Sequence, residues 1–222
     1  MPQQQALPAW VVLNAANDTA ASGMADQYTG FPYNAGGLNL GEYFDLTSQE
    51  AFRNCKPSVG VLYCGRYRRI QVDSGATAAN VKTGTIGVLA SQAAASQDIG
   101  NIGGALPVSM NVVTSFDKGI GPANTLIRPV VFLNSITPGN FGYVQELGVA
   151  SVLARATLTN ATPLQGDVIQ VQSGGAGLVD DPTQSGNVTF VTLSLVIGIA
   201  YDIPQNGKLF RILLDAVPVV QD

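Results

Sequence analysis

Apolar and polar residues alternate with a period of two through the C-terminal third of the chain. In "NVTFVTLSLVIGIAYDI", residues 187–203, the odd positions from 191 to 199 are apolar, whereas Thr192 and Ser194 fall on the opposite side. The segment "KLFRILLD" repeats this alternation. Such a pattern predicts strands with one face in a core and the other toward solvent or another chain. The core residues predicted here are Val191, Leu193, Leu195, Ile197, Ile199, Phe210 and Ile212.

Shorter alternating runs extend the pattern toward the N-terminus. In "DVIQVQS" the alternation points Ile169 and Val171 inward, and Ile70 and Val72 continue an alternating run in "SVGVLYCGRYRRIQV". Pro129 stands inside the strand-like run "TLIRPVVFLNSI". Because proline cannot donate a ladder hydrogen bond, it predicts an edge position or the start of a strand.

Many short strands separated by glycine-containing turns predict an all-β protein. We expect a small antiparallel β-barrel or sandwich formed by residues 126–215, within a β-rich body that spans residues 61–222. Several glycines should mark turns, bulges or bends where a Cβ atom would be unfavourable, namely Gly139, Gly142, Gly148, Gly166 and Gly198.

Residues 1–60 differ from this body and predict an extended, loop-rich N-terminal arm. They combine the proline-flanked segment "QALPAW" with aromatic residues among glycines, and the one short helical turn they predict begins near Thr47 or Ser48. The aromatic residues lack a periodic core of their own, so they are expected to pack against the following domain or against another subunit. Trp10, Phe31 and Tyr33 are therefore candidate interface residues.

Charge and composition exclude several classes of function. The formal charge is −4, charged residues make up 12% of the chain, and histidine is absent. We therefore expect no nucleic-acid partner. Arg66, Arg68 and Arg69 form the nearest approach to a basic patch, and they are interpreted as a solvated strand face or a partner contact.

The N-terminal residues predict neither a secretory signal nor a membrane anchor. They lack a basic n-region, and no apolar run in the chain approaches the roughly 18 residues needed to cross a bilayer. We expect synthesis in the cytosol and no membrane partner. Cys55 and Cys64 stand at a spacing that fits neither a redox pair nor a zinc knuckle, so both are expected to be reduced and buried, with a disulfide as the alternative.

No motif in the sequence supports catalysis. The segments "GGAGLVDDP" and "NIGGAL" lack the Lys-Ser/Thr of a phosphate loop and the spacing of a dinucleotide-binding turn. Asp180 and Asp181 precede Pro182, where an acidic turn or a calcium contact would each account for them. No G-x-S-x-G elbow is present, and the three glutamates are scattered. We expect no catalytic residues, no metal and no cofactor.

Five segments together resemble the small β-barrel domain of tailed-bacteriophage head decoration, or cement, proteins. They are "ITPGNFGYVQELGVASVL", "GDVIQV", "GAGLVDD", "VIGIAYD" and "GKLFRILL". The family commonly shows a G-x-V-Q-x-x-G-x-A-x-V strand, which here runs from Gly142 to Val152. The resemblance covers residues 126–215, and residues 1–60 depart from the family pattern.

The resemblance implies a structural virion protein on the outer capsid surface. Such proteins bind the shell, bridge neighbouring capsomers and are typically trimers, so the implied partners are the major capsid protein and further copies of the chain. Under this resemblance, Trp10, Phe31 and Tyr33 are expected to form a capsid or subunit interface, and the protein is expected to be made in the host cytoplasm. A head fibre or adhesin that binds a host glycan or surface protein is the alternative, and a hydrolase that uses only acidic residues is a third interpretation.

Overall fold

The computed structural model describes residues 43–47, 64–91, 108–116, 129–172, 176–182 and 196–214. Ten strands account for most of this part, so the predicted all-β fold is confirmed. No helix within these ranges is long and apolar enough to cross a membrane. The elements are β1 (Tyr43–Leu46), β2 (Gly65–Val72), the 3₁₀ turn η1 (Ala78–Asn80), β3 (Ile86–Ser91), β4 (Val108–Ser115), β5 (Val130–Phe132), β6 (Phe141–Leu153), β7 (Val168–Val171), β8 (Val179–Asp180), β9 (Val196–Ala200) and β10 (Leu209–Leu214).

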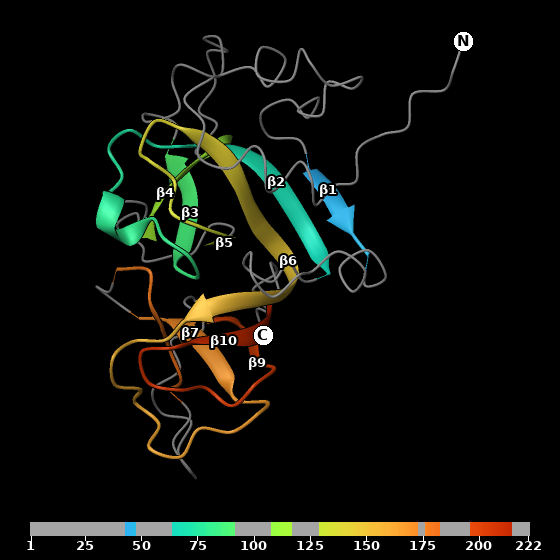
Figure 1. Cartoon of the computed structure of the whole chain (residues 1–222), viewed down its shortest axis with the longest axis vertical. Coiled ribbons are helices and arrows are strands. Elements are labelled where there is room, and N and C mark those ends of the chain that lie inside the picture. The colour runs from blue at the N-terminus through green and yellow to red at the C-terminus, as the bar shows by residue number, and fades with distance from the viewer. Residues whose placement is uncertain are drawn as a thin grey trace.

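Five strands close a first barrel in the order β2-β4-β3-β5-β6, because β6 pairs with β2 as well as with β5 (Figure 1). Neighbouring strands are antiparallel except β2 and β4, which run parallel. Small β-barrels are filled by their own side chains. The interior cluster here consists of Ile70, Val72, Ala76, Val81, Val113, Val130, Phe132, Ile136 and Val144.

The long strand β6 belongs to two barrels. Its first part pairs with β2 from Phe141 to Gly148, and its last part pairs with β10 from Gly148 to Leu153. Gly148 has a φ of +93°, and a Cβ atom there would clash with the backbone carbonyl of Cys64. The strand can change partners at this point because glycine tolerates both the backbone conformation and the close approach.

The second barrel has the strand order β6-β10-β9-β7-β8 with antiparallel neighbours. A parallel bridge between Ala154 and Val179 joins the end of β6 to β8 and closes the ring. This barrel has a short interior, to which β10 contributes Phe210, Ile212 and Leu214. The inward positions predicted for Ile197, Phe210 and Ile212 are confirmed, since each is at most 5% exposed.

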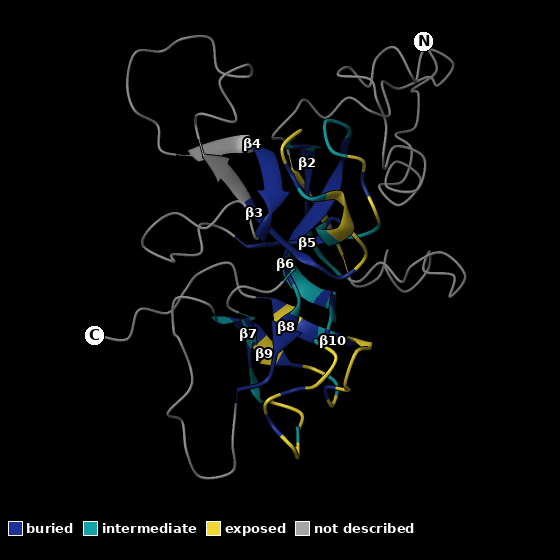
Figure 2. Cartoon of the chain, turned by 90° about the vertical axis from the view of Figure 1, so that its left-hand side faces the viewer, coloured by how far each residue is buried: buried dark blue, intermediate teal, exposed yellow. Residues whose placement is uncertain are grey.

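A shared core joins the two barrels. One buried cluster combines Ile86, Val88 and Val131 of the first barrel with residues of the second. Figure 2 shows the described strands of the first barrel as mostly buried, and those of the second barrel with buried, intermediate and exposed stretches. The backbone contributes as well, because Leu153 N donates to Gly84 O at 2.8 Å and Ile86 N donates to Gly177 O at 2.8 Å. The barrels are therefore parts of one packed body.

The strand pairing divides the body differently from the expected unit at residues 126–215. β5 and the first part of β6 pair with β2 and β3 and so belong to the first barrel. β1 falls within the region expected to be loop-rich, yet it pairs with β2 in an antiparallel register from Tyr43–Arg68 to Leu46–Gly65. Pro129 directly precedes β5, which confirms the prediction of a strand start.

One predicted core residue is exposed. Ile199 is 45% exposed, whereas Ile197 and Ala200 are 1% and 2% exposed. On the neighbouring strand, Ile169 lies opposite Gly198 and Gln170 opposite Val196, so β9 contains one residue more than β7 at this point. A β-bulge of this kind shifts the side-chain alternation by one position, which turns Ile199 outward. Val191, Leu193 and Leu195 lie outside the described residues.

Gly139 and Gly166 adopt positive φ angles in turns, as predicted for these positions. Gly142 differs, because it lies inside β6 opposite Ile70.

Candidate functional site

The interface residues predicted from sequence, Trp10, Phe31 and Tyr33, lie outside the described residues, as does Cys55. Cys64 is a free cysteine of intermediate burial, so the prediction that it is buried is wrong. The described residues form two polar clusters, an apolar face and an ion pair that crosses this face.

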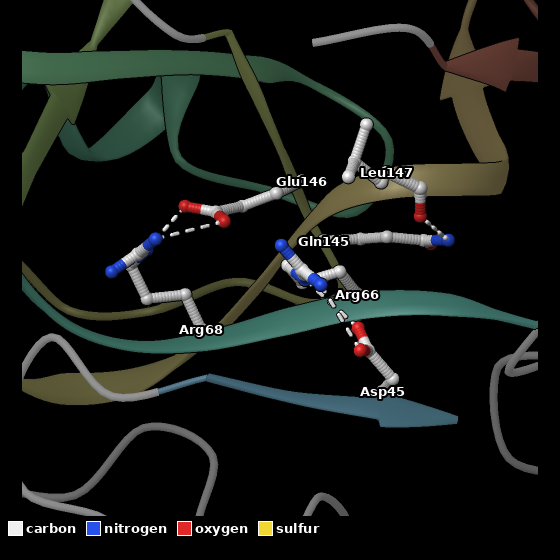
Figure 3. A network of polar contacts seen from close by, with 6 residues as sticks. All are labelled: Asp45, Arg66, Arg68, Gln145, Glu146 and Leu147. Carbon is white, nitrogen blue, oxygen red and sulfur yellow. Dashed lines mark hydrogen bonds and ion pairs between the residues drawn. The ribbon is translucent and has the colours of Figure 1, made fainter.

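The first polar cluster lies where β1, β2 and β6 meet (Figure 3). Asp45 lies directly opposite Arg66, and its two carboxylate oxygens accept hydrogen bonds from Arg66 Nε at 2.8 Å and Nη2 at 3.0 Å. The hydrogen bonds from Arg66 lower the pKa of Asp45. The Tyr43 ring lies 4.2 Å from the Arg66 guanidinium carbon, a cation–π contact on the same pair of strands.

Arg68 and Glu146 form the inner part of this cluster. Both Arg68 Nε and Nη2 donate to the Glu146 carboxylate, and each side chain is 8% exposed. Glu146 has no opposite residue on β2, because Arg66 lies opposite Leu147 and Tyr67 opposite Gln145. This bulge places a carboxylate beside Arg68 inside the sheet.

The three arginines were interpreted as a solvated strand face or a partner contact, and the solvated face is wrong for two of them. Arg68 is 7% exposed and Arg69 is 1% exposed, and Arg69 lies 5.7 Å from the Phe141 ring and 5.5 Å from the Tyr143 ring. The alternation does not separate the arginines, because Arg66 and Arg68 both share the parity of the inward residues Ile70 and Val72. Burial of Arg68 accompanies its ion pair with Glu146 of β6.

The Gln145 side chain stabilises the irregular part of β6. Its Nε2 donates to Leu147 O at 3.1 Å and to Val149 O at 2.8 Å, on either side of Gly148. Burial of these carbonyls without a partner would be costly. The first cluster therefore has a structural role: it attaches β1 to the barrel and supports the bend in β6.

The second polar cluster fixes the loop between β6 and β7. The Asp180 carboxylate accepts hydrogen bonds from Arg155 Nη1 at 2.8 Å, Thr159 N at 2.8 Å and Thr159 Oγ1 at 2.6 Å. Asn160 Nδ2 donates to both Asp181 and Asp167 at 3.1 Å. The two aspartates considered for calcium are thus engaged with protein donors, and within the described ranges no three His, Cys, Asp or Glu side chains gather as metal ligands.

The apolar face lies on the outer side of the second barrel. Ile199 of β9 and Leu213 of β10 are directly opposite each other and each is 45% exposed. Leu209 is 47% exposed and Tyr201 is 46% exposed, and Ile203 in the connection that follows β9 is 56% exposed. We call the outer surface formed by Ile199, Tyr201, Leu209 and Leu213 the β9–β10 face.

One ion pair crosses the β9–β10 face. Arg211 Nη2 lies 2.6 Å from Asp202 Oδ1, Arg211 Nε donates to Asp202 Oδ2 at 2.7 Å, and the Tyr201 ring lies 4.8 Å from the Arg211 guanidinium carbon. The hydrogen bond from Arg211 lowers the pKa of Asp202. The pair neutralises the charge that Arg211 brings to β10, so the strands offer a nearly uncharged surface.

The consecutive leucines Leu213 and Leu214 were the sequence signal for this face. Neighbouring residues of a strand point to opposite sides, so one of two adjacent leucines in β10 had to point away from the core. The bulge at Ile197 adds Ile199 to the same outer side.

Comparisons with family models, curated proteins and solved structures find no match for this chain.

Proposed function

We propose that this chain is a structural virion protein that binds the outer capsid surface of a tailed bacteriophage and stabilises the shell by bridging capsomers. It acts through contact surfaces, with the major capsid protein and further copies of itself as partners. The sequence resemblance of residues 126–215 to head decoration proteins supports the virion assignment.

The observation that carries the proposal is the exposed β9–β10 face on a rigid double barrel. Four large apolar side chains on this face are about half exposed, and exposed apolar patches mark interaction surfaces. The carboxylates of Asp45, Glu146, Asp180 and Asp202 are each held by an arginine. This arrangement fits a protein whose role is adhesion and mechanical support.

Binding to shells tests the proposal. Capsids that lack the protein are mixed with the purified full chain, and saturable co-sedimentation is expected, together with a higher temperature of DNA release from the decorated particles. An unrelated phage capsid is the control. The absence of saturable binding would refute the proposal, and binding to host cell envelopes in its place would support the head fibre or adhesin.

A further inference from the structure

We infer that the β9–β10 face packs against a second copy of this chain. The inference names the partner of the surface on which the proposed function also rests, and its test requires no capsid.

The first argument is the composition of the face. The inner sides of β9 and β10 supply core residues, including Ile197 and Ile212, while the outer sides expose Ile199 and Leu213. A sheet that is apolar on both sides has the pattern of a layer between two packed layers. Two such sheets pack face to face about 10 Å apart in β-sandwiches.

The second argument is charge. The eleven residues of β9 and β10 contain one charged side chain, Arg211, and Asp202 neutralises it. Two copies carry the same formal charge of −4 and would repel if the contact surfaces were acidic. A neutral face removes this repulsion at the contact, whereas a strongly charged partner would find no complementary charge there.

The third argument is area. Half-exposed side chains of this size each present on the order of 100 Å², so the four residues of the face present on the order of 400 Å². A stable interface of standard size buries about 800 Å² per partner, with an apolar centre and a polar rim. The face provides the apolar centre of such an interface, which also contains the neutralised Arg211–Asp202 pair, and polar residues around it, among them Lys208, would contribute to the rim.

Sedimentation of the full chain between 1 and 100 µM, in the absence of capsids, tests the inference. The wild type is expected to self-associate, and Leu213→Glu and Ile199→Glu are each expected to raise the dissociation constant at least tenfold. Leu164→Glu is the matched control, because Leu164 is 62% exposed and lies in the loop between β6 and β7. This control should associate as the wild type does.

A second measurement needs no substitution and covers the case in which a glutamate variant unfolds. Hydroxyl-radical footprinting of the wild type at low and high concentration should show Tyr201, Leu209 and Leu213 becoming protected as association proceeds. A wild type that is monomeric at 100 µM, or association that leaves these residues unprotected, would overturn the inference.

Shell binding separates the two proposals. A monomeric Leu213→Glu variant that still binds capsids supports the inference and leaves the proposed function intact. A monomeric wild type whose capsid binding is lost in Leu213→Glu would assign the face to the shell and overturn the inference. An oligomer that depends on the face but binds no capsid would refute the proposed function alone.

Discussion

Arg68 of β2 and Glu146 of β6 form a buried ion pair between two neighbouring strands of the first barrel, and each side chain is 8% exposed. The pair exists because a bulge in β6 leaves Glu146 without an opposite residue on β2. The contact therefore ties the irregular point of β6 to the strand that also holds β1.

Removing one member of this pair should destabilise the protein strongly. Arg68→Met or Glu146→Leu leaves a buried charge without its partner, and we expect a loss of about 3–5 kcal/mol in the free energy of unfolding. The double variant should recover most of this loss because no isolated charge remains. Urea unfolding of the four proteins measures the coupling.

The more exposed ion pair between Arg66 and Asp45 provides the matched control for this prediction. Asp45→Asn breaks the ion pair between Asp45 and Arg66, whose side chains are 57% and 33% exposed. The substitution should lower the free energy of unfolding by less than about 1 kcal/mol. Equal losses for Asp45→Asn and Glu146→Leu would contradict the role assigned to burial.

The bend in β6 should depend on glycine. Gly148→Ala places a Cβ atom against the carbonyl of Cys64 in a backbone of positive φ, so we expect a loss of more than about 3 kcal/mol. Gly139→Ala is the control, because Gly139 has a φ of +89° with open space around it. Its loss should stay near the 1–2 kcal/mol of backbone strain alone. Thermal and urea unfolding compare the two, and equal losses would show that the close approach at Gly148 is unimportant.

Truncation of two adjacent residues of β10 should have very different effects on the free energy of unfolding. Ile212 is fully buried, so Ile212→Ala should cost about 2–5 kcal/mol. Leu213 is 45% exposed, so Leu213→Ala should change the stability of the monomer by less than about 1 kcal/mol. Urea unfolding below the concentration of self-association measures both, and a large loss for Leu213→Ala would place its side chain in the core.

Acidification should remove the contribution of Asp202. Its pKa is lower in the folded protein than the usual value of about 3.9, so the stabilisation is fully present above that value and is lost as the pH falls through the folded pKa. Both partners are about one third exposed, so solvent screening limits the contribution to at most about 1 kcal/mol. The stability difference between wild type and Asp202→Asn should therefore be largest at pH 5–7 and should shrink below pH 4. A difference that stays constant from pH 7 to pH 2.5 would refute the assignment.

The N-terminal residues should attach the protein to the shell. Trp10→Ala, or deletion of residues 2–16, is expected to leave a folded protein that binds capsids at least tenfold more weakly, which is about 1.4 kcal/mol. Binding to depleted capsids and circular dichroism measure the two properties. Unchanged occupancy would refute the attachment role, and misfolding would indicate that these residues complete the core.

The strands were predictable where the alternation is regular. Phe210 and Ile212 point inward as the pattern requires, and Pro129 marks the start of β5. The inward position predicted for Ile199 was wrong because a bulge depends on the pairing with β7, which the local pattern does not contain.

The sequence also could not reveal how residues distant along the chain combine. Arg68 and Glu146 are separated by 78 positions, and their contact depends on the register of β2 against β6. The β9–β10 face is likewise a product of register, since Ile199 joins Leu213 only once the two strands are paired. Local periodicity indicates which residues form strands, but tertiary pairing decides which side chains meet.

Because β6 belongs to both barrels, we expect the two barrels to fold and unfold together. A chain break within Phe141–Leu153 would remove a strand from one barrel. The apolar cluster that spans the junction would then lose part of its packing. Heat or denaturant should therefore open both barrels in a single cooperative transition. A mechanical force applied to one barrel would be transmitted to the other through the continuous backbone of β6. The double barrel can therefore bear tension as a single unit.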